Sequence, residues 1–177
     1  TFDNGMICAS EQAIIVDNEV YNDVKAEFLA HNAYIVSSKA ELAKLQAAVM
    51  LPDGHAVNPK IVGFSAKYIA ELAGIKVPEE TKLLIAEIAG VGADFPLSRE
   101  KLSPVLAMVK ANSTEEGLDL CEAMLDLGGL GHTAVIHTED EDLQIQFGIR
   151  MKACRILVNT PAAEGGIGNI YNEMLPS

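Results

Sequence analysis

The feature of this sequence that most constrains its fold is the alternation of short apolar segments with longer amphipathic ones. Residues 13–16, 34–36, 105–109 and 156–158 are apolar along their whole length, and segments with helical spacing of apolar residues lie between them. Strands without polar alternation are typical of a parallel sheet that is buried on both faces. The pattern therefore predicts a single α/β domain with a mostly parallel sheet flanked by helices.

Capping and turn residues divide the chain further. Ser38 and Ser113 are typical helix N-caps, and Gly74 and Gly129 are typical of helix ends. The segment from Pro161 onward is rich in glycine, and we expect it to be irregular. Strands are also expected over residues 83–88 and 133–137, and helices over residues 19–31, 39–50, 65–73, 114–127 and 141–152.

Charge and hydropathy exclude several classes of protein. The net charge is −12, and the 13 basic residues are scattered, so no cluster is available to bind a nucleic acid backbone. No apolar run reaches the ~20 residues that span a bilayer, and no signal peptide opens the chain. We predict a cytoplasmic protein that binds neither nucleic acid nor membranes. Because the chain begins at Thr1 and ends at Ser177 without an obvious start or stop signal, we expect a segment of a longer polypeptide.

The three cysteines differ in their surroundings. Their odd number and unrelated spacings predict neither a disulfide framework nor a metal site. Cys121 lies in a helical pattern and Cys154 opens an apolar strand, so both are interpreted as small core residues. Cys8 instead follows a turn that contains Gly5, and small residues come directly after it. A thiol at the mouth of a turn is accessible to substrate and is a candidate nucleophile, whereas the alternative is a partly buried structural cysteine.

Two more residues are candidates for the same site. Glu100 lies in an irregular segment just before Pro104 and an apolar strand, and His132 leads into another strand. Loops at one end of a parallel sheet gather into a site, so we expect both near the Cys8 loop. Without that placement, Glu100 is a solvated surface residue and His132 a capping or exposed one. The glycines of residues 165–169 lack the spacing of a dinucleotide fingerprint and are interpreted as a substrate-side loop.

Three motifs carry a resemblance to a known family. FDNGMIC (residues 2–8) resembles the nucleophile motif of the NAD-dependent aldehyde dehydrogenase superfamily. CASEQ (residues 8–12) resembles its CoA-acylating branch, in particular the acetaldehyde dehydrogenase half of bifunctional aldehyde–alcohol dehydrogenases. EKLSPV (residues 100–105) is similar to the Glu-x-Phe-Gly-Pro-Val motif of the superfamily, with departures at Leu102 and Ser103.

The resemblance implies a fold, an activity and roles for the candidate residues. The fold is the aldehyde dehydrogenase catalytic-domain type. Cys8 is the nucleophile, Glu100 contacts the ribose hydroxyls on the nicotinamide side of NAD, and His132 lies near the active site. The implied reaction interconverts acetyl-CoA and NADH with acetaldehyde, CoA and NAD through a thioester on Cys8. The partners are thus a small-molecule aldehyde and acyl-CoA, and the full-length chain is expected to form a homo-oligomer.

Residues 1–177 are accordingly expected to be the cysteine-bearing catalytic domain of a longer chain, without its NAD-binding domain. Two alternatives stay open. One is a hydrolytic aldehyde dehydrogenase, which forms a free acid without CoA. The other is a non-enzymatic assembly domain in which Cys8 is buried and inert.

Overall fold

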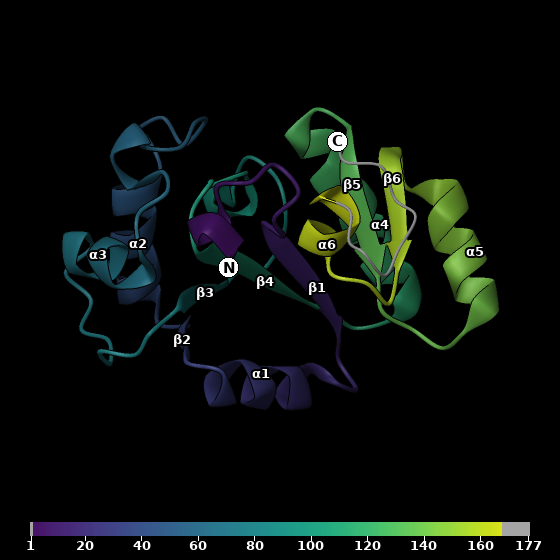
Figure 1. Ribbon diagram of the computed structural model, residues 1–177, viewed down its shortest axis with the longest axis horizontal. Helices are drawn as coiled ribbons and strands as arrows, with labels where there is room; N and C mark the ends of the chain where they lie inside the picture. Colours follow the sequence, from purple (N-terminus) through teal and green to yellow (C-terminus); the bar gives the residue numbers. More distant parts are fainter. Residues whose placement is uncertain (1, 168–177) are drawn as a thin grey trace.

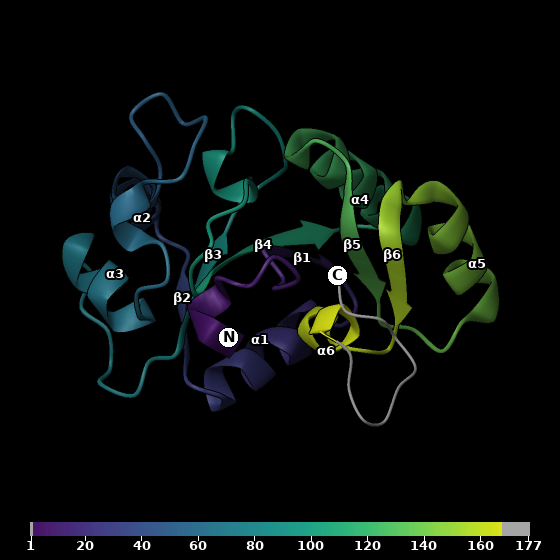
Figure 2. The same cartoon turned by 45° about the horizontal axis from the view of Figure 1, so that its top comes forward.

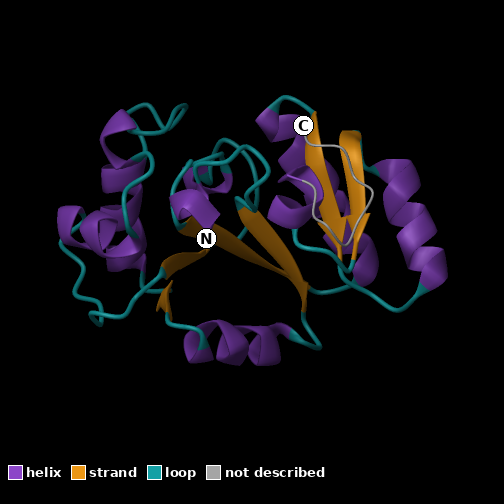
Figure 3. Cartoon of the chain, viewed as in Figure 1, coloured by secondary structure: helices purple, strands orange, loops and turns teal. Residues whose placement is uncertain are grey.

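The computed structural model describes residues 2–167. Its strands form two sheets, and the strands within each sheet are parallel (Figure 1, Figure 3). The larger sheet has the order β1-β4-β3-β2, and the smaller one pairs β5 with β6. Every neighbouring pair in both sheets is parallel. The strands are β1 (Ala13–Asp17), β2 (Ala33–Val36), β3 (Leu83–Glu87), β4 (Val105–Ala111), β5 (Gly131–Ile136) and β6 (Ala153–Val158).

The helices begin and end close to the predicted positions. The Ser38 and Ser113 hydroxyls accept hydrogen bonds from backbone N–H groups three residues later, which confirms both N-caps. Gly74 and Gly129 have positive φ angles just after their helices, which confirms both ends. The helices are α1 (Tyr21–Ala30), α2 (Lys39–Val49), α3 (Ala66–Leu72), α4 (Thr114–Gly128), α5 (Glu141–Arg150) and α6 (Ala162–Ile167).

Helices cover both faces of the larger sheet. Side chains of successive strand residues point to opposite faces. Leu84 accordingly packs in the cluster that contains Leu45 of α2 and Ile69 of α3, whereas Ile85 packs in the cluster that Phe28 of α1 joins. The side chains of Leu45, Ile69 and Leu84 are fully buried. The predicted α/β class is confirmed.

The smaller sheet forms its own cluster with α4 and α5. The buried residues of this cluster are Leu118, Phe147 and Met151. Arg150 of α5 also donates hydrogen bonds to carboxylates of α4, including that of Asp119. The alternation of segments predicted one sheet, but the strands divide between two. Local hydrophobic pattern indicates that a segment is a strand, but it does not specify which strand it pairs with.

The expectation of an irregular segment after Pro161 is wrong for residues 162–167, which form α6, and residues 168–177 lie outside the described residues. A Cβ atom on Gly165 would lie 2.4 Å from Leu157 Cδ1, and one on Gly166 would lie 2.2 Å from Ala9 Cβ. These glycines therefore permit close packing of a helix and do not mark a flexible loop. Gly168 and Asn169, the last two residues of the predicted substrate-side loop (residues 165–169), lie outside the described residues.

Candidate active site

Cys8 lies in the N-terminal loop (residues 3–12), whose tight turn is built from left-handed residues. Asp3, Asn4 and Gly5 have φ angles of 49°, 51° and 72°. Asp and Asn tolerate this region better than most residues. At Gly5 a side chain is excluded outright, because a Cβ atom there would lie 2.6 Å from the carbonyl oxygen of Ser103. The predicted turn is thus present, and it is pressed against the chain just after Glu100.

The thiol of Cys8 is exposed on this anchored loop. Asn4 Nδ2 donates a hydrogen bond to the Gly63 carbonyl oxygen at 3.0 Å, and the Gly63 N–H donates to the Leu102 carbonyl oxygen at 3.0 Å. Ala9, the next residue after Cys8, is buried. The loop is therefore held on both sides of a cysteine that solvent reaches, a geometry that suits an attacking nucleophile.

The Glu100 segment lies beside the N-terminal loop because the two strands that follow them are neighbours. β1 and β4 pair in parallel, with Ala13 opposite Ala107, so the chain ends that enter these strands meet at one edge of the sheet. The N–H of Lys101 donates to Gln12 Oε1 at 2.8 Å, which links the two segments directly. The side chain of Glu100 is exposed at this edge. The structure thus brings the segments of Cys8 and Glu100 together.

Lys101 is a residue of this edge that the sequence analysis did not identify. Its side chain is fully buried, and its Nζ lies within hydrogen-bond distance of the carbonyl oxygens of Gln12, Leu97 and Arg99. Burial lowers the pKa of Lys101 to about 7, and the nearby carboxylate of Glu100 opposes that shift. A lone lysine next to a glutamate in an irregular segment has no local pattern that distinguishes it from a surface residue.

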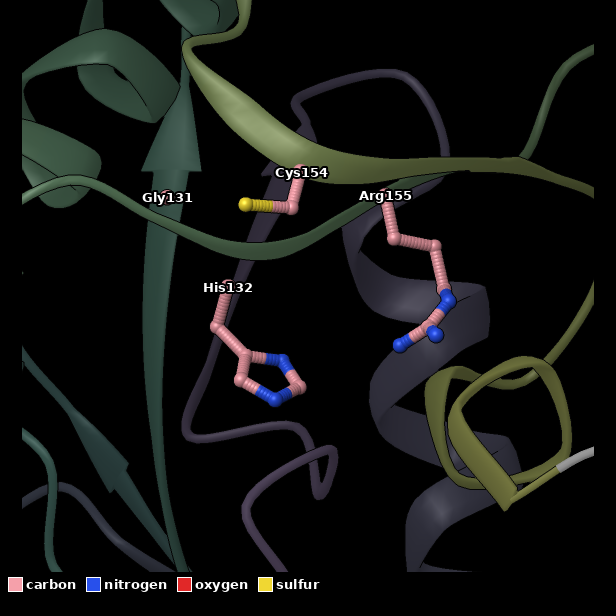
Figure 4. A pocket seen from close by; sticks show the side chains of 4 residues that line it. All are labelled: Gly131, His132, Cys154 and Arg155. Atoms are coloured by element: carbon pink, nitrogen blue, oxygen red, sulfur yellow. The ribbon is translucent and has the colours of Figure 1, made fainter. Parts of the chain in front are cut away.

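His132 lies at the beginning of β5 and is exposed. Its Nδ1 is 2.7 Å from the hydroxyl oxygen of Thr133, which orients the ring. His132 lines a pocket of about 180 Å³ together with Gly131, Cys154 and Arg155, and Figure 4 shows the ring of His132 and the guanidinium of Arg155 extending in the same general direction. The imidazole is thus placed at an open pocket, where it can exchange protons with a bound molecule.

Cys154 is exposed in this pocket, so its interpretation as a core residue is wrong. It lies near the beginning of β6, which pairs with β5 alone among the described strands. Cys121 does pack against the cluster of Leu118 and Phe147, and burial raises the pKa of its thiol to about 11. The structure therefore separates an inert thiol from two exposed ones.

Helix α6 connects the N-terminal loop to the pocket of His132. The Ala162 N–H at its beginning donates to Glu11 Oε1 at 2.7 Å. A Cβ atom on Gly166 would lie against Ala9 and 3.8 Å from Arg155 Nη1. The residue that follows Cys8 and a residue of the His132 pocket thus both approach the same glycine. The N-terminal loop thus contacts the segment of Glu100 on one side and α6 on the other, whereas neither Cys8 nor Glu100 lines the pocket of His132.

Two negative observations concern the described residues 2–167. They contain no group of three or more His, Cys, Asp or Glu side chains placed to hold a metal ion. Among the same residues, no helix combines the length and the apolar character that crossing a membrane requires.

Comparison with known proteins places this arrangement in a class. No family model matches the chain. An acetylating aldehyde dehydrogenase from Geobacillus thermoglucosidasius superimposes with a TM-score of 0.89 and 44% identity, over 95% of this chain and 36% of that one. A propionaldehyde dehydrogenase from Rhodopseudomonas palustris, solved with bound CoA and an acylated cysteine, superimposes with a TM-score of 0.85 at 23% identity and shares the fold; 99% of this chain and 38% of that one are covered. The fold is therefore that of the acetylating aldehyde dehydrogenases.

Comparison with sequence relatives gives a more specific class than the fold does. Aldehyde-alcohol dehydrogenase 2 of Entamoeba histolytica is 47% identical over 183 residues, which cover 100% of this chain and 21% of that protein. The bifunctional aldehyde-alcohol dehydrogenase of Escherichia coli is 46% identical over 181 residues, with 100% of this chain and 20% of that protein covered. The chain is thus homologous over its whole length to one segment of the aldehyde-alcohol dehydrogenases, which confirms the resemblance seen in residues 2–12. It spans about a fifth of the length of these relatives.

Proposed function

We propose that this chain is the cysteine-bearing part of an NAD-dependent, CoA-acylating aldehyde dehydrogenase that interconverts acetaldehyde, CoA and NAD with acetyl-CoA and NADH. The observation that carries the proposal is the exposed thiol of Cys8 on a loop anchored against the segment of Glu100. The names of the homologues and of the structural neighbour at 44% identity support the acetylating reaction. The exposure of Cys8 disfavours the alternative of an assembly domain with a buried, inert thiol.

Cys8 has the role of nucleophile and leaving group. Its Sγ attacks the aldehyde carbon, and the new carbon–sulfur bond gives a thiohemiacetal whose oxygen holds the former carbonyl electrons. Loss of a hydride from that carbon leaves a thioester on Cys8. The thiol of CoA then attacks the thioester, a proton leaves the CoA sulfur, and Cys8 departs as a thiolate. Thioester exchange requires no activated water, which distinguishes this reaction from the hydrolytic alternative.

Glu100 and His132 have supporting roles. NAD, when bound, accepts the hydride. The exposed carboxylate of Glu100 suits two ribose hydroxyls as hydrogen-bond donors, and the neighbouring backbone is fixed to Gln12, so a nicotinamide held there would keep its position relative to Cys8. His132, in its open pocket, suits the transfer of the proton from the CoA thiol.

We also infer that residues 1–177 act only as part of a longer polypeptide. The chain corresponds to about a fifth of its relatives, and the resemblance to the superfamily implies an NAD-binding domain elsewhere in the protein. The isolated segment is expected to bind NAD weakly and to show no turnover. A cytoplasmic location and a homo-oligomeric state of the full-length protein remain predictions. Measurable turnover by the isolated chain would contradict the inference that residues 1–177 act only as part of a longer polypeptide.

The test is an assay of NADH oxidation with acetyl-CoA on the full-length protein, with Cys8→Ala as the variant. Removing a nucleophile commonly costs on the order of 10⁴-fold or more, so activity should fall to background. The matched control is Cys121→Ala, which removes a half-buried thiol outside the site and should retain activity. Equal activity in Cys8→Ala and wild type would exclude Cys8 as nucleophile. Cys8-dependent oxidation of aldehyde without CoA would instead support the hydrolytic alternative.

A further inference from the structure

The fully buried side chain of Lys101 has no carboxylate as a hydrogen-bond partner in the described structure. Lysine is almost never fully buried without a partner of opposite charge, because transfer of an ammonium from water to the protein interior is costly. Here the Nζ instead contacts the carbonyl oxygens of Gln12 at 2.9 Å, Leu97 at 2.9 Å and Arg99 at 2.6 Å. A lysine ammonium has three N–H donors, so all of them are used.

The acceptors belong to the two segments that form the candidate site. Gln12 closes the N-terminal loop, whereas Leu97 and Arg99 precede Glu100. The link to Gln12 is double, since the backbone N–H of Lys101 also donates to Gln12 Oε1 at 2.8 Å. The same Gln12 carbonyl accepts the Ala107 N–H at 3.2 Å, where the pairing of β1 with β4 begins. The ammonium therefore joins both segments to the edge of the larger sheet.

Contacts of Gln12 extend this connection toward Cys8. The Gln12 Nε2 lies 3.4 Å from the Ser10 carbonyl oxygen and 3.5 Å from the Gly5 carbonyl oxygen. These two carbonyls flank Cys8 in the chain. The contacts are long, but they come from a side chain whose oxygen is already fixed by the Lys101 N–H.

Other polar atoms around the same edge are buried without compensation. The hydroxyls of Ser10 and Ser103 and the Nε of Arg99 have no hydrogen-bond partner among the described residues. Native structures contain few such atoms, and a concentration of them is typical of a place where function, and not stability, selects the residues. Lys101 lies midway between Arg99 and Ser103 in the chain.

We propose that Lys101 is a positioning residue, whose ammonium holds the loop of Cys8 and the segment of Glu100 at a fixed separation for hydride transfer. The inference rests on the proposed function. Hydride transfer requires the carbon bound to Cys8 and the nicotinamide to be aligned closely, and a displacement of about 1 Å can cost about 100-fold in rate. Transfer of an acetyl group from CoA to Cys8 involves the thiol and the proton transfer assigned to His132, and it needs no alignment with Glu100.

The proposal therefore predicts that loss of the ammonium separates the two half-reactions. In the full-length protein, Lys101→Met replaces the side chain by an unbranched apolar one of similar length. We expect single-turnover oxidation of NADH by the acetylated enzyme to fall about 10- to 100-fold. Acetylation of Cys8 by acetyl-CoA is followed without NADH by mass spectrometry. Its rate should stay within about twofold of wild type, because this half-reaction does not require alignment of Cys8 with Glu100. The matched control is Lys44→Met, an exposed lysine of α2.

Each outcome of this experiment decides between accounts. Parallel loss of both half-reactions, in proportion to the folded fraction measured by circular dichroism, would show a purely structural residue and overturn the proposal. Wild-type rates for both would overturn it too. Absence of acetylation in wild type would reject the proposed function instead. Gln12→Met, which removes only the side-chain half of the link, provides a second variant if Lys101→Met does not fold, and it should show the same separation with a smaller effect.

Discussion

The two sheets of this molecule differ in how firmly they hold the side chains at their edges. In the larger sheet, β4 has six buried residues out of seven, and helices cover both faces (Figure 2). In the smaller sheet, β5 has no buried residue, and the hydrophobic cluster that it shares with α4 and α5 contains three buried residues. The segments of Cys8 and Glu100 enter the first sheet, whereas His132 begins a strand of the second.

The difference suggests a division of tasks. Hydride transfer depends on a precise distance, and its two candidate residues lie on segments tied by buried hydrogen bonds. Proton exchange with the thiol of CoA tolerates more freedom, and its candidate residue lies at an open pocket with one oriented contact. Helix α6 joins the two parts through Glu11 and Gly166.

The largest expected effect concerns the three thiols. Burial raises the pKa of Cys121 from its ordinary value of 9.0 to about 11, so its thiolate fraction at pH 7 falls by about a hundredfold. Cys8 and Cys154 are exposed. Iodoacetamide labelling of the native protein, followed by peptide mass spectrometry, should modify Cys8 and Cys154 long before Cys121. Cys8 labelling as slow as that of Cys121 would contradict the exposed nucleophile.

His132→Ala tests the smaller sheet. Loss of a general acid or base commonly costs about 100-fold or more, so turnover with acetyl-CoA should fall by that factor. His137→Ala, just after β5 and also exposed, is the control and should retain the rate. Equal behaviour of the two variants would remove His132 from the mechanism.

Gly166→Ala tests the packing of α6 against the N-terminal loop. The added methyl would lie 2.2 Å from Ala9 Cβ, so either Ala9, the residue next to Cys8, or α6 must move. We expect kcat to fall about tenfold, as for a displacement of a fraction of an ångström. Gly148→Ala is the same substitution inside α5, where nothing lies within 4 Å of the new atom, and it should stabilise the helix by about 1 kcal/mol. Unchanged activity in Gly166→Ala would show that α6 does not position the loop.

The smallest effect is a pH dependence of stability due to Lys101. Burial lowers its folded pKa to about 7, whereas the unfolded lysine titrates near its ordinary value, so the unfolded state binds more protons between these two limits. This group therefore makes the protein more stable as pH rises from about 7, by at most about 1.4 kcal/mol per pH unit. The slope vanishes below pH 7, where both states are protonated.

Urea denaturation of wild type and Lys101→Met at pH 7, 8 and 9 measures this slope as a difference between two proteins. All other titrating groups are shared, so they cancel to a first approximation. The difference in free energy of unfolding, wild type minus variant, should rise with pH. A constant difference would mean that the three carbonyl acceptors keep the ammonium charged throughout, and that burial does not depress its pKa.

Local physical chemistry made much of the fold predictable. Apolar runs identified the segments of all the strands, and Ser38, Ser113, Gly74 and Gly129 marked helix ends, because caps and left-handed residues act within one turn. The division into two sheets depends on pairing between distant segments, which no local pattern encodes. Helix α6 was missed because Gly165 and Gly166 are indistinguishable in sequence from the glycines of a loop.

The sequence proposed Cys8 beside a glycine turn and Glu100 before a strand as candidates for one site. The pairing of β1 with β4 brings their segments together, while the roles of the two residues stay predictions. Lys101 was not identified, since a buried lysine has the same sequence pattern as an exposed one. Cys154 was misjudged because burial of a strand residue depends on neighbours that only the tertiary structure supplies.

The most direct test of the account is to identify the acyl acceptor. Full-length protein is incubated with acetyl-CoA in the absence of NADH, quenched in acid, and analysed by intact and peptide mass spectrometry, with Cys8→Ala in parallel. The account predicts one added acetyl group on wild type, located on the peptide that contains Cys8, and none on the variant. Acetylation that persists in Cys8→Ala, or that maps to Cys154, would contradict it.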